Sequence, residues 1–152
     1  NNSVINFTGC GSGAMYVAGV GNETLNAAGS SSHNFMVGGT SAGGQVSLVG
    51  GSGNDTIAVG AGSDTMATGA GQDVVAFFQN ATSGAHDYIT DFDNTNDSVL
   101  ILGYDSTKSA SYLVDNASTV GGGVTLTLSD STQITFTSLT SASQLYGKIL
   151  YG

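Results

Sequence analysis

Three aspartates recur at nine-residue intervals among glycines. Over residues 50–76 the chain repeats a nonapeptide three times with nothing inserted, and the sixth place of each copy is an aspartate, namely Asp55, Asp64 and Asp73. Glycine holds the second and fourth places, and an apolar residue holds the eighth. Regularly spaced carboxylates can bind a hard metal cation. A pair of them can also serve as the acid and base of a glycosidase.

The repeat resembles the G-G-x-G-x-D-x-U-x nonapeptide of the RTX family of secreted proteins. The resemblance implies a parallel β-roll loaded with calcium. Physical chemistry agrees, because glycines allow six residues to turn sharply and the other three form a short strand with one inward apolar side chain. Two copies then make one coil, so that Ile57 and Val75 belong to one sheet and Leu48 and Met66 to the facing sheet.

This register places a calcium site between Asp55 and Asp73. Strands of successive coils stack about 4.8 Å apart, and two bare carboxylates at that distance repel by roughly 3 to 4 kcal/mol at an effective dielectric of 20. A calcium ion removes this repulsion and accepts backbone carbonyls in loose geometry. The resemblance implies that turns 50–55 and 68–73 supply such carbonyls, which adds Gly51, Gly53, Gly69 and Gly71 to the expected site.

Asp64 is the weaker candidate at the opposite edge. An eighteen-residue coil gives it Val46 and Thr82 as neighbours, neither of them a carboxylate. We therefore expect one good calcium site, with at most an incomplete one at this second edge. The alternative is a β-solenoid whose aspartates only solvate the turns.

A second acidic stretch follows the repeats. Asp87-Tyr-Ile-Thr-Asp91-Phe resembles the D-x-I-x-D-F segment found just beyond the roll in RTX proteins, so the resemblance adds Asp87 and Asp91 to the expected metal ligands. Asp93 and Asp97 lie in the acidic turn after it. A solvated acidic loop is the alternative.

The remaining sequence predicts an all-β chain in one structural domain with three parts. Residues 1–49 read as degenerate solenoid coils, with Glu23 or Val46 in place of Asp and a longer loop at 27–34. Residues 50–78 hold the calcium-binding repeats, and the strand at 74–78 is expected to end the regular array. Residues 79–152 form a C-terminal cap with an antiparallel hairpin around 129–132, which overlaps the secretion-type segment that the resemblance implies.

The composition of the chain excludes several classes of partner and site. The net charge is −9 and the chain has two Lys and no Arg, so nucleic acid is excluded as a partner because bidentate Arg contacts are impossible. No apolar run is long enough to span a bilayer. Cys10 is the only cysteine and cannot form an intrachain disulfide. The chain has no initiator Met, and we interpret it as part of a longer polypeptide.

These observations predict a calcium-binding module without catalytic activity, in a secreted or cell-surface bacterial protein exported by a type I apparatus. No nucleophile–base motif appears, and a carboxylate pair on a convex edge has no substrate cleft. Two alternatives stay open: a surface-layer or filament subunit that self-associates through open sheet edges, and an accessory module of an exported enzyme. An adhesin or ice-binding face lacks the strict Thr repeat it would need.

Overall fold

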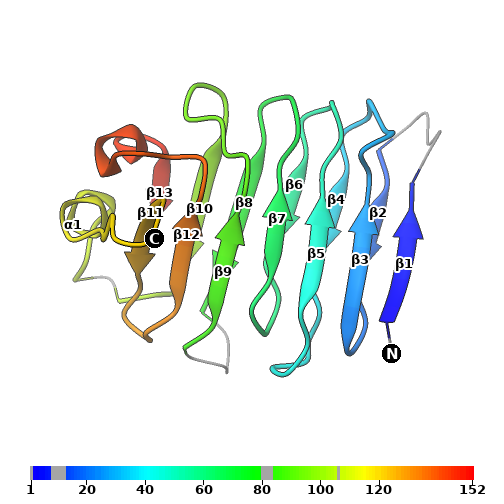
Figure 1. The fold of residues 1–152 in the computed structure, drawn as a ribbon, viewed down its shortest axis with the longest axis horizontal. Coiled ribbons are helices and arrows are strands. Elements are labelled where there is room, and N and C mark those ends of the chain that lie inside the picture. The colour runs from blue at the N-terminus through cyan, green and yellow to red at the C-terminus, as the bar shows by residue number, and fades with distance from the viewer. Residues whose placement is uncertain (1, 8–12, 80–83, 106) are drawn as a thin grey trace.

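The computed structural model describes residues 2–7, 13–79, 84–105 and 107–152. Within these residues the chain forms two facing β-sheets, and successive strands mostly alternate between them (Figure 1). Sheet A contains, in spatial order, β1 (Asn2–Asn6), β3 (Asn22–Asn26), β5 (Val46–Val49), β7 (Thr65–Ala67), β9 (His86–Ile89), β12 (Gln133–Phe136) and β11 (Val124–Thr127). Sheet B contains β13 (Ile149–Tyr151), β10 (Ser98–Leu102), β8 (Val74–Phe78), β6 (Thr56–Ala58), β4 (Phe35–Val37) and β2 (Met15–Val17).

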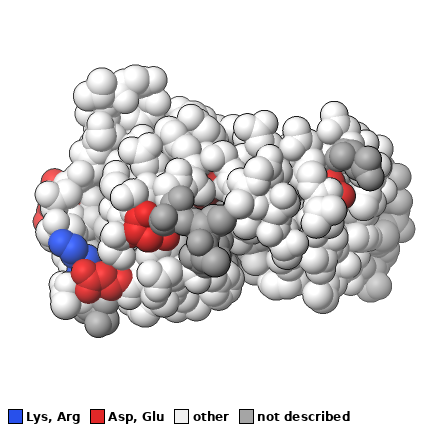
Figure 2. Space-filling view, turned by 90° about the horizontal axis from the view of Figure 1, so that it is seen from below, with Lys and Arg blue, Asp and Glu red and all other residues white. Residues whose placement is uncertain are grey.

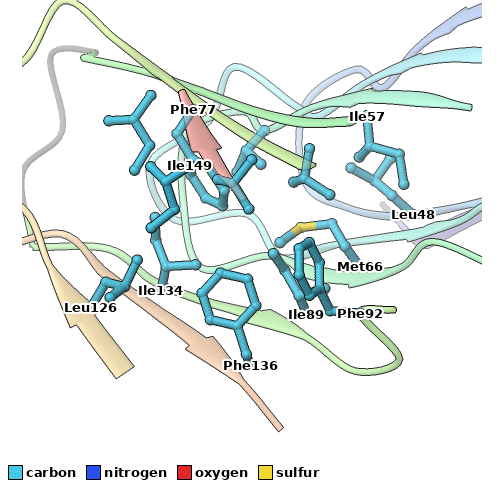
Figure 3. Close-up of a cluster of buried hydrophobic side chains, with 14 of the residues drawn as sticks. Leu48, Ile57, Met66, Phe77, Ile89, Phe92, Leu126, Ile134, Phe136 and Ile149 are labelled. Carbon is cyan, nitrogen blue, oxygen red and sulfur yellow. The ribbon is translucent and has the colours of Figure 1, made fainter. Parts of the chain in front are cut away.

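The apolar eighth residue of each nonapeptide points into the space between the sheets. Leu48 pairs with Met66 in sheet A and Ile57 pairs with Val75 in sheet B, and all four side chains are fully buried. Both predicted pairings are therefore confirmed. Figure 3 shows how these side chains continue toward the C-terminal strands, where the ring of Phe136 lies edge-on to Phe92 at 5.1 Å. Each fully buried side chain of this size contributes about 1.5–3 kcal/mol through removal from water.

Glycine is required where the turns stack on one another. A Cβ on Gly51 would lie 2.1 Å from the carbonyl oxygen of Ser30, and a Cβ on Gly69 would lie 2.1 Å from the carbonyl oxygen of Gly51. Gly69 also has φ +92°, which side chains rarely adopt. The regular glycines therefore allow each turn to sit directly on the carbonyl groups of the turn before it.

The parallel array does not end at residue 78. The strand β8 pairs in parallel with β10, and β10 pairs in parallel with β13, while β9 continues sheet A beside β7. The prediction that the strand 74–78 closes the regular array is wrong. The loops after it are longer, but they return the chain to the same strand positions.

The C-terminal segment adds the antiparallel pair of the structure. The strands β11 and β12 pair with Val124 opposite Phe136 and Leu126 opposite Ile134, and β12 also pairs in parallel with β9. The segment holds the helix α1 (Ala110–Asp115) and the 3-10 helix η1 (Ala142–Leu145). Neither described helix has the length or the apolar character to cross a membrane.

Both cationic residues lie in this C-terminal part. The Lys108 ammonium sits 3.9 Å from the centre of the Tyr112 ring, and the Lys148 ammonium donates to the Thr95 carbonyl oxygen at 2.7 Å. In Figure 2 the basic side chains accordingly gather at one end of the molecule.

Candidate metal centre

The turns stack along two edges of the sheets. We call edge 1 the stack of turns that lead into sheet B, which contains turns 27–34, 50–55, 68–73 and 90–97 and lies at the top of Figure 1. Edge 2 contains the turns that lead into sheet A, including turn 59–64. The predicted ligands Asp55 and Asp73 both lie on edge 1, each directly before its strand.

On edge 1 the acidic side chains form a ladder in which each carboxylate reaches back to the preceding turn. The Oδ1 atom of Asp73 accepts from the Asp55 N–H at 2.6 Å, and Oδ1 of Asp97 accepts from the Asp73 N–H at 3.2 Å. Asp55 accepts in the same way from the Asn34 N–H at 2.7 Å. The ladder position therefore runs Asn34, Asp55, Asp73, Asp97.

Asp73 carries a buried carboxylate oxygen. Its side chain is 1% exposed, and its Oδ2 has no hydrogen-bond partner among the described residues. The pKa of Asp73 is raised to about 6, mainly by burial and also by the charges of Asp97, Asp55 and Asp91, while the hydrogen bond from the Asp55 N–H opposes the shift. A buried carboxylate oxygen without a donor costs stability unless a cation or a proton binds it.

Backbone carbonyls line the contacts between neighbouring turns of edge 1. A Cβ on Gly50 would lie 2.0 Å from the carbonyl oxygen of Thr68 and 2.9 Å from Oδ2 of Asp55, so a carboxylate and a carbonyl of neighbouring turns meet where only glycine leaves room. The carbonyl oxygen of Gly51 would lie 2.1 Å from a Cβ built on Gly69, and the carbonyl oxygen of Gly53 would lie 2.4 Å from a Cβ built on Gly71. All four glycines are predicted ligand residues. Carboxylate and carbonyl oxygens are the ligand set that calcium prefers.

Asp91 and Asp97 extend this acidic group beyond the nonapeptides. Asp91 does not cap its own turn: its Oδ1 accepts from the Thr68 N–H at 2.6 Å and its Oδ2 from the Gly69 N–H at 3.1 Å. Oδ2 of Asp97 accepts from the Thr68 hydroxyl at 3.0 Å. Turn 68–73 thus lies between Asp55 on one side and Asp91 and Asp97 on the other. Asp97 occupies the next ladder position, for which the sequence analysis predicted no residue.

Edge 2 holds a carboxylate pair that the sequence reading missed. Oδ1 of Asp64 accepts from the Val46 N–H at 2.9 Å, so the predicted neighbour on that side is in place. On the other side Oδ1 of Asp87 accepts from the Asp64 N–H at 2.8 Å. The expected neighbour Thr82 is outside the described residues, and its assignment is wrong because this circuit of the chain spans 23 residues, not eighteen.

Both members of this pair are deeply buried. Oδ2 of Asp64 has no hydrogen-bond partner among the described residues. Burial raises the pKa of Asp64, while hydrogen bonds from the N–H groups of Val46 and Gly60 lower it. The pKa of Asp87 is raised to about 7, mainly by burial and to a smaller extent by the Asp64 charge, while the hydrogen bond from the Asp64 N–H opposes the shift. The second edge therefore has the same unpaired acidic character as the first.

The oxygen chemistry of both edges fits calcium. Within the described part of the chain, no group of three or more Asp, Glu, His or Cys side chains converges on one point. A cation between these turns must therefore take most of its ligands from backbone carbonyls, which calcium accepts. Cys10 lies outside the described residues.

Comparison with known proteins supports this assignment for the repeat region. Residues 47–75 match the family model described as the RTX calcium-binding nonapeptide repeat (4 copies). The match covers Asp55, Asp64 and Asp73, while Asp87, Asp91 and Asp97 lie beyond it. A search of curated proteins finds no match to the chain.

Proposed function

Because residues 47–75 are RTX nonapeptide repeats, which bind calcium, we propose that the chain is a non-catalytic calcium-binding β-roll module of a secreted or cell-surface bacterial protein. RTX repeats are typical of secreted proteins, which supports the extracellular location. The observation that carries the proposal is the buried Oδ2 of Asp73, which has no hydrogen-bond partner among the described residues, while Oδ1 of the same carboxylate accepts from the Asp55 N–H of the preceding turn.

The residues that would hold calcium follow from the two edges. On edge 1, Asp55 and Asp73 would bind together with carbonyl oxygens of turns 50–55 and 68–73. Asp73 and Asp97 make a second candidate in the next gap of the same edge, where Asp91 contributes charge to the neighbouring turn. On edge 2, Asp64 and Asp87 make the third. Calcium would supply positive charge to the Oδ2 atoms of Asp73 and Asp64, which have no hydrogen-bond partner among the described residues.

This arrangement links folding to calcium concentration. Without the metal, the stacked carboxylates repel, and ordering a chain of 24 glycines costs conformational entropy. Binding that favours only the folded form stabilises it by about 2.7 kcal/mol at a hundredfold excess over the dissociation constant. We infer that the module stays poorly folded in a cytosol poor in calcium and folds as a closed roll outside, where the β11–β12 hairpin caps one end.

A calcium titration of the isolated chain tests the proposal. Circular dichroism should show β-structure increasing with calcium, and Asp73→Ala should shift the midpoint to higher calcium, as should Asp55→Ala. Asp115→Ala is the matched control, since it removes an exposed carboxylate in α1 and should leave the midpoint unchanged. Full β-structure in excess chelator, or a wild-type midpoint for both edge 1 variants, would refute calcium-linked folding.

Self-association is a second candidate supported by one observation. The strand β1 stands at the end of sheet A, pairs with β3 alone among the described strands, and has all five residues exposed. An uncovered edge of this kind can add a strand from another copy. Electron microscopy and light scattering of the calcium-loaded chain distinguish a lattice or filament from a monomeric module.

A further inference from the structure

Asp55 differs from its ladder neighbour Asp73 because protein donors satisfy both of its oxygens. Its Oδ1 accepts from the Asn34 N–H at 2.7 Å and from the Asn34 side-chain Nδ2–H at 2.8 Å. Its Oδ2 accepts from the Gly51 N–H at 2.6 Å. Asp73 on the same edge and Asp64 on edge 2 each keep a buried oxygen that has no partner in the described part of the chain.

Asn34 occupies the ladder position of the preceding turn. Its side chain is 3% exposed, and the local structure fixes the orientation of its amide. Nδ2 donates to the Ser32 carbonyl oxygen at 2.9 Å as well as to Asp55, while Oδ1 accepts from the Ser30 hydroxyl at 3.4 Å. Both partners of Nδ2 are acceptors, so the opposite assignment of the amide atoms would lose two hydrogen bonds.

An amide at this place changes what the gap between turns 27–34 and 50–55 can hold. An aspartate here would stand one strand spacing, about 4.8 Å, from Asp55 and would require a cation between them. The asparagine donates a hydrogen to Asp55 without adding charge. A carboxylate has about four acceptor positions, so Asp55 can still contribute to a cation on its other side, toward Asp73.

We propose that the Asn34 amide takes the place of a calcium ion above Asp55 and thereby ends the run of calcium sites on edge 1. The inference rests on the proposed calcium-binding function and adds a residue that limits the number of ions. It also predicts that a single atom-for-atom exchange of the amide for a carboxylate creates a new calcium site in this gap.

The test is the calcium stoichiometry of the whole chain, measured by isothermal titration calorimetry and native mass spectrometry. Asn34→Asp should bind one more calcium ion than the wild type. Asn54→Asp is the matched control: it adds the same charge in turn 50–55, at an exposed position outside the ladder, and should bind no additional ion.

A third variant separates this role from a purely structural one. Asn34→Ala removes the Nδ2–H donor and should lower stability equally with and without calcium, whereas calcium should restore Asn34→Asp to wild-type stability. Unchanged stoichiometry in Asn34→Asp while the wild type binds calcium would overturn this inference alone. If calcium stabilised Asn34→Asp no more than Asn34→Ala, the inference would fail as well. A wild-type chain that binds no calcium would overturn both this inference and the proposed function.

Discussion

In the absence of calcium, the stability of the chain should fall as the pH rises from about 4 to 7, with Asp87 as a main cause. The pKa of this buried carboxyl is raised from 3.8 to about 7 in the folded chain. Between these values the folded state holds a proton that the unfolded state has released, so the free energy of unfolding decreases with pH. The stabilising effect is complete below pH 3.8 and is lost once the pH passes 7.

The size of the effect follows from the shift. One pKa unit corresponds to 1.36 kcal/mol, so a change from 3.8 to about 7 amounts to about 4 kcal/mol. This is a large part of the 5–15 kcal/mol that typically stabilises a domain. Asp73 acts in the same direction, because its pKa is raised to about 6.

Urea titrations in chelator, followed by circular dichroism from pH 4 to 7.5, measure this slope. Where the chain is already unfolded without urea, the fraction folded against pH replaces the titration. Asp87→Asn should reduce the slope substantially, above all between pH 6 and 7, and Asp115→Asn should keep it. Saturating calcium should flatten the wild-type profile above pH 6, because the ion replaces the proton. A free energy of unfolding that is constant or increases from pH 4.5 to 7 would refute the reasoning, as would a full slope in Asp87→Asn.

Three further predictions concern the stacked turns and the core. Gly69→Ala should lower the free energy of unfolding by about 2–5 kcal/mol, from left-handed backbone strain and overpacking. Gly121→Ala has the same φ of +92° but open space around it, and should lower it by about 1–2 kcal/mol. Equal losses of stability in thermal unfolding would exclude the stacking clash. Phe136→Ala should cost about 3–5 kcal/mol and lower a single unfolding transition of the whole chain, and calorimetry that shows two transitions would contradict one shared core. Asp97→Asn should lower the pKa of Asp73, since Asp97 is its strongest charged neighbour; a carboxyl NMR titration that finds it unchanged would exclude that coupling.

The nonapeptide phase was enough to predict the strand pairs of the central repeats. With no residue inserted between copies, an eighteen-residue period specifies Val75 as the neighbour of Ile57 and Met66 as the neighbour of Leu48. It also places Asp55 and Asp73 on the same edge, where the structure brings them together. This part could be predicted because close stacking leaves the glycine turns no freedom in length.

The period failed where a loop changed length. Phase alone assigned position 82 to the place that Asp87 takes, and it left Asp97 unassigned although Asp97 precedes an apolar strand just as Asp73 does. Asn34 was overlooked because its tract contains no regular glycines, and its role depends on an amide orientation that only the fold defines. The helix α1 was difficult to predict from the sequence, because it has only six residues, a Ser109 N-cap and two buried side chains.

The positions of the two lysines determine where trypsin can cleave this chain. Trypsin cleaves after Lys or Arg, so it has two sites, Lys108 on the Tyr112 ring and Lys148 on the acidic turn. Both lie beyond the stacked aspartates, and residues 1–107 contain no tryptic site whether the chain is folded or unfolded. Trypsin resistance is therefore built into the repeats by composition and says nothing about calcium there. A protease that cuts at apolar residues would report on the repeats, and trypsin on the C-terminal segment, so the two enzymes used side by side resolve where along the chain calcium protects it.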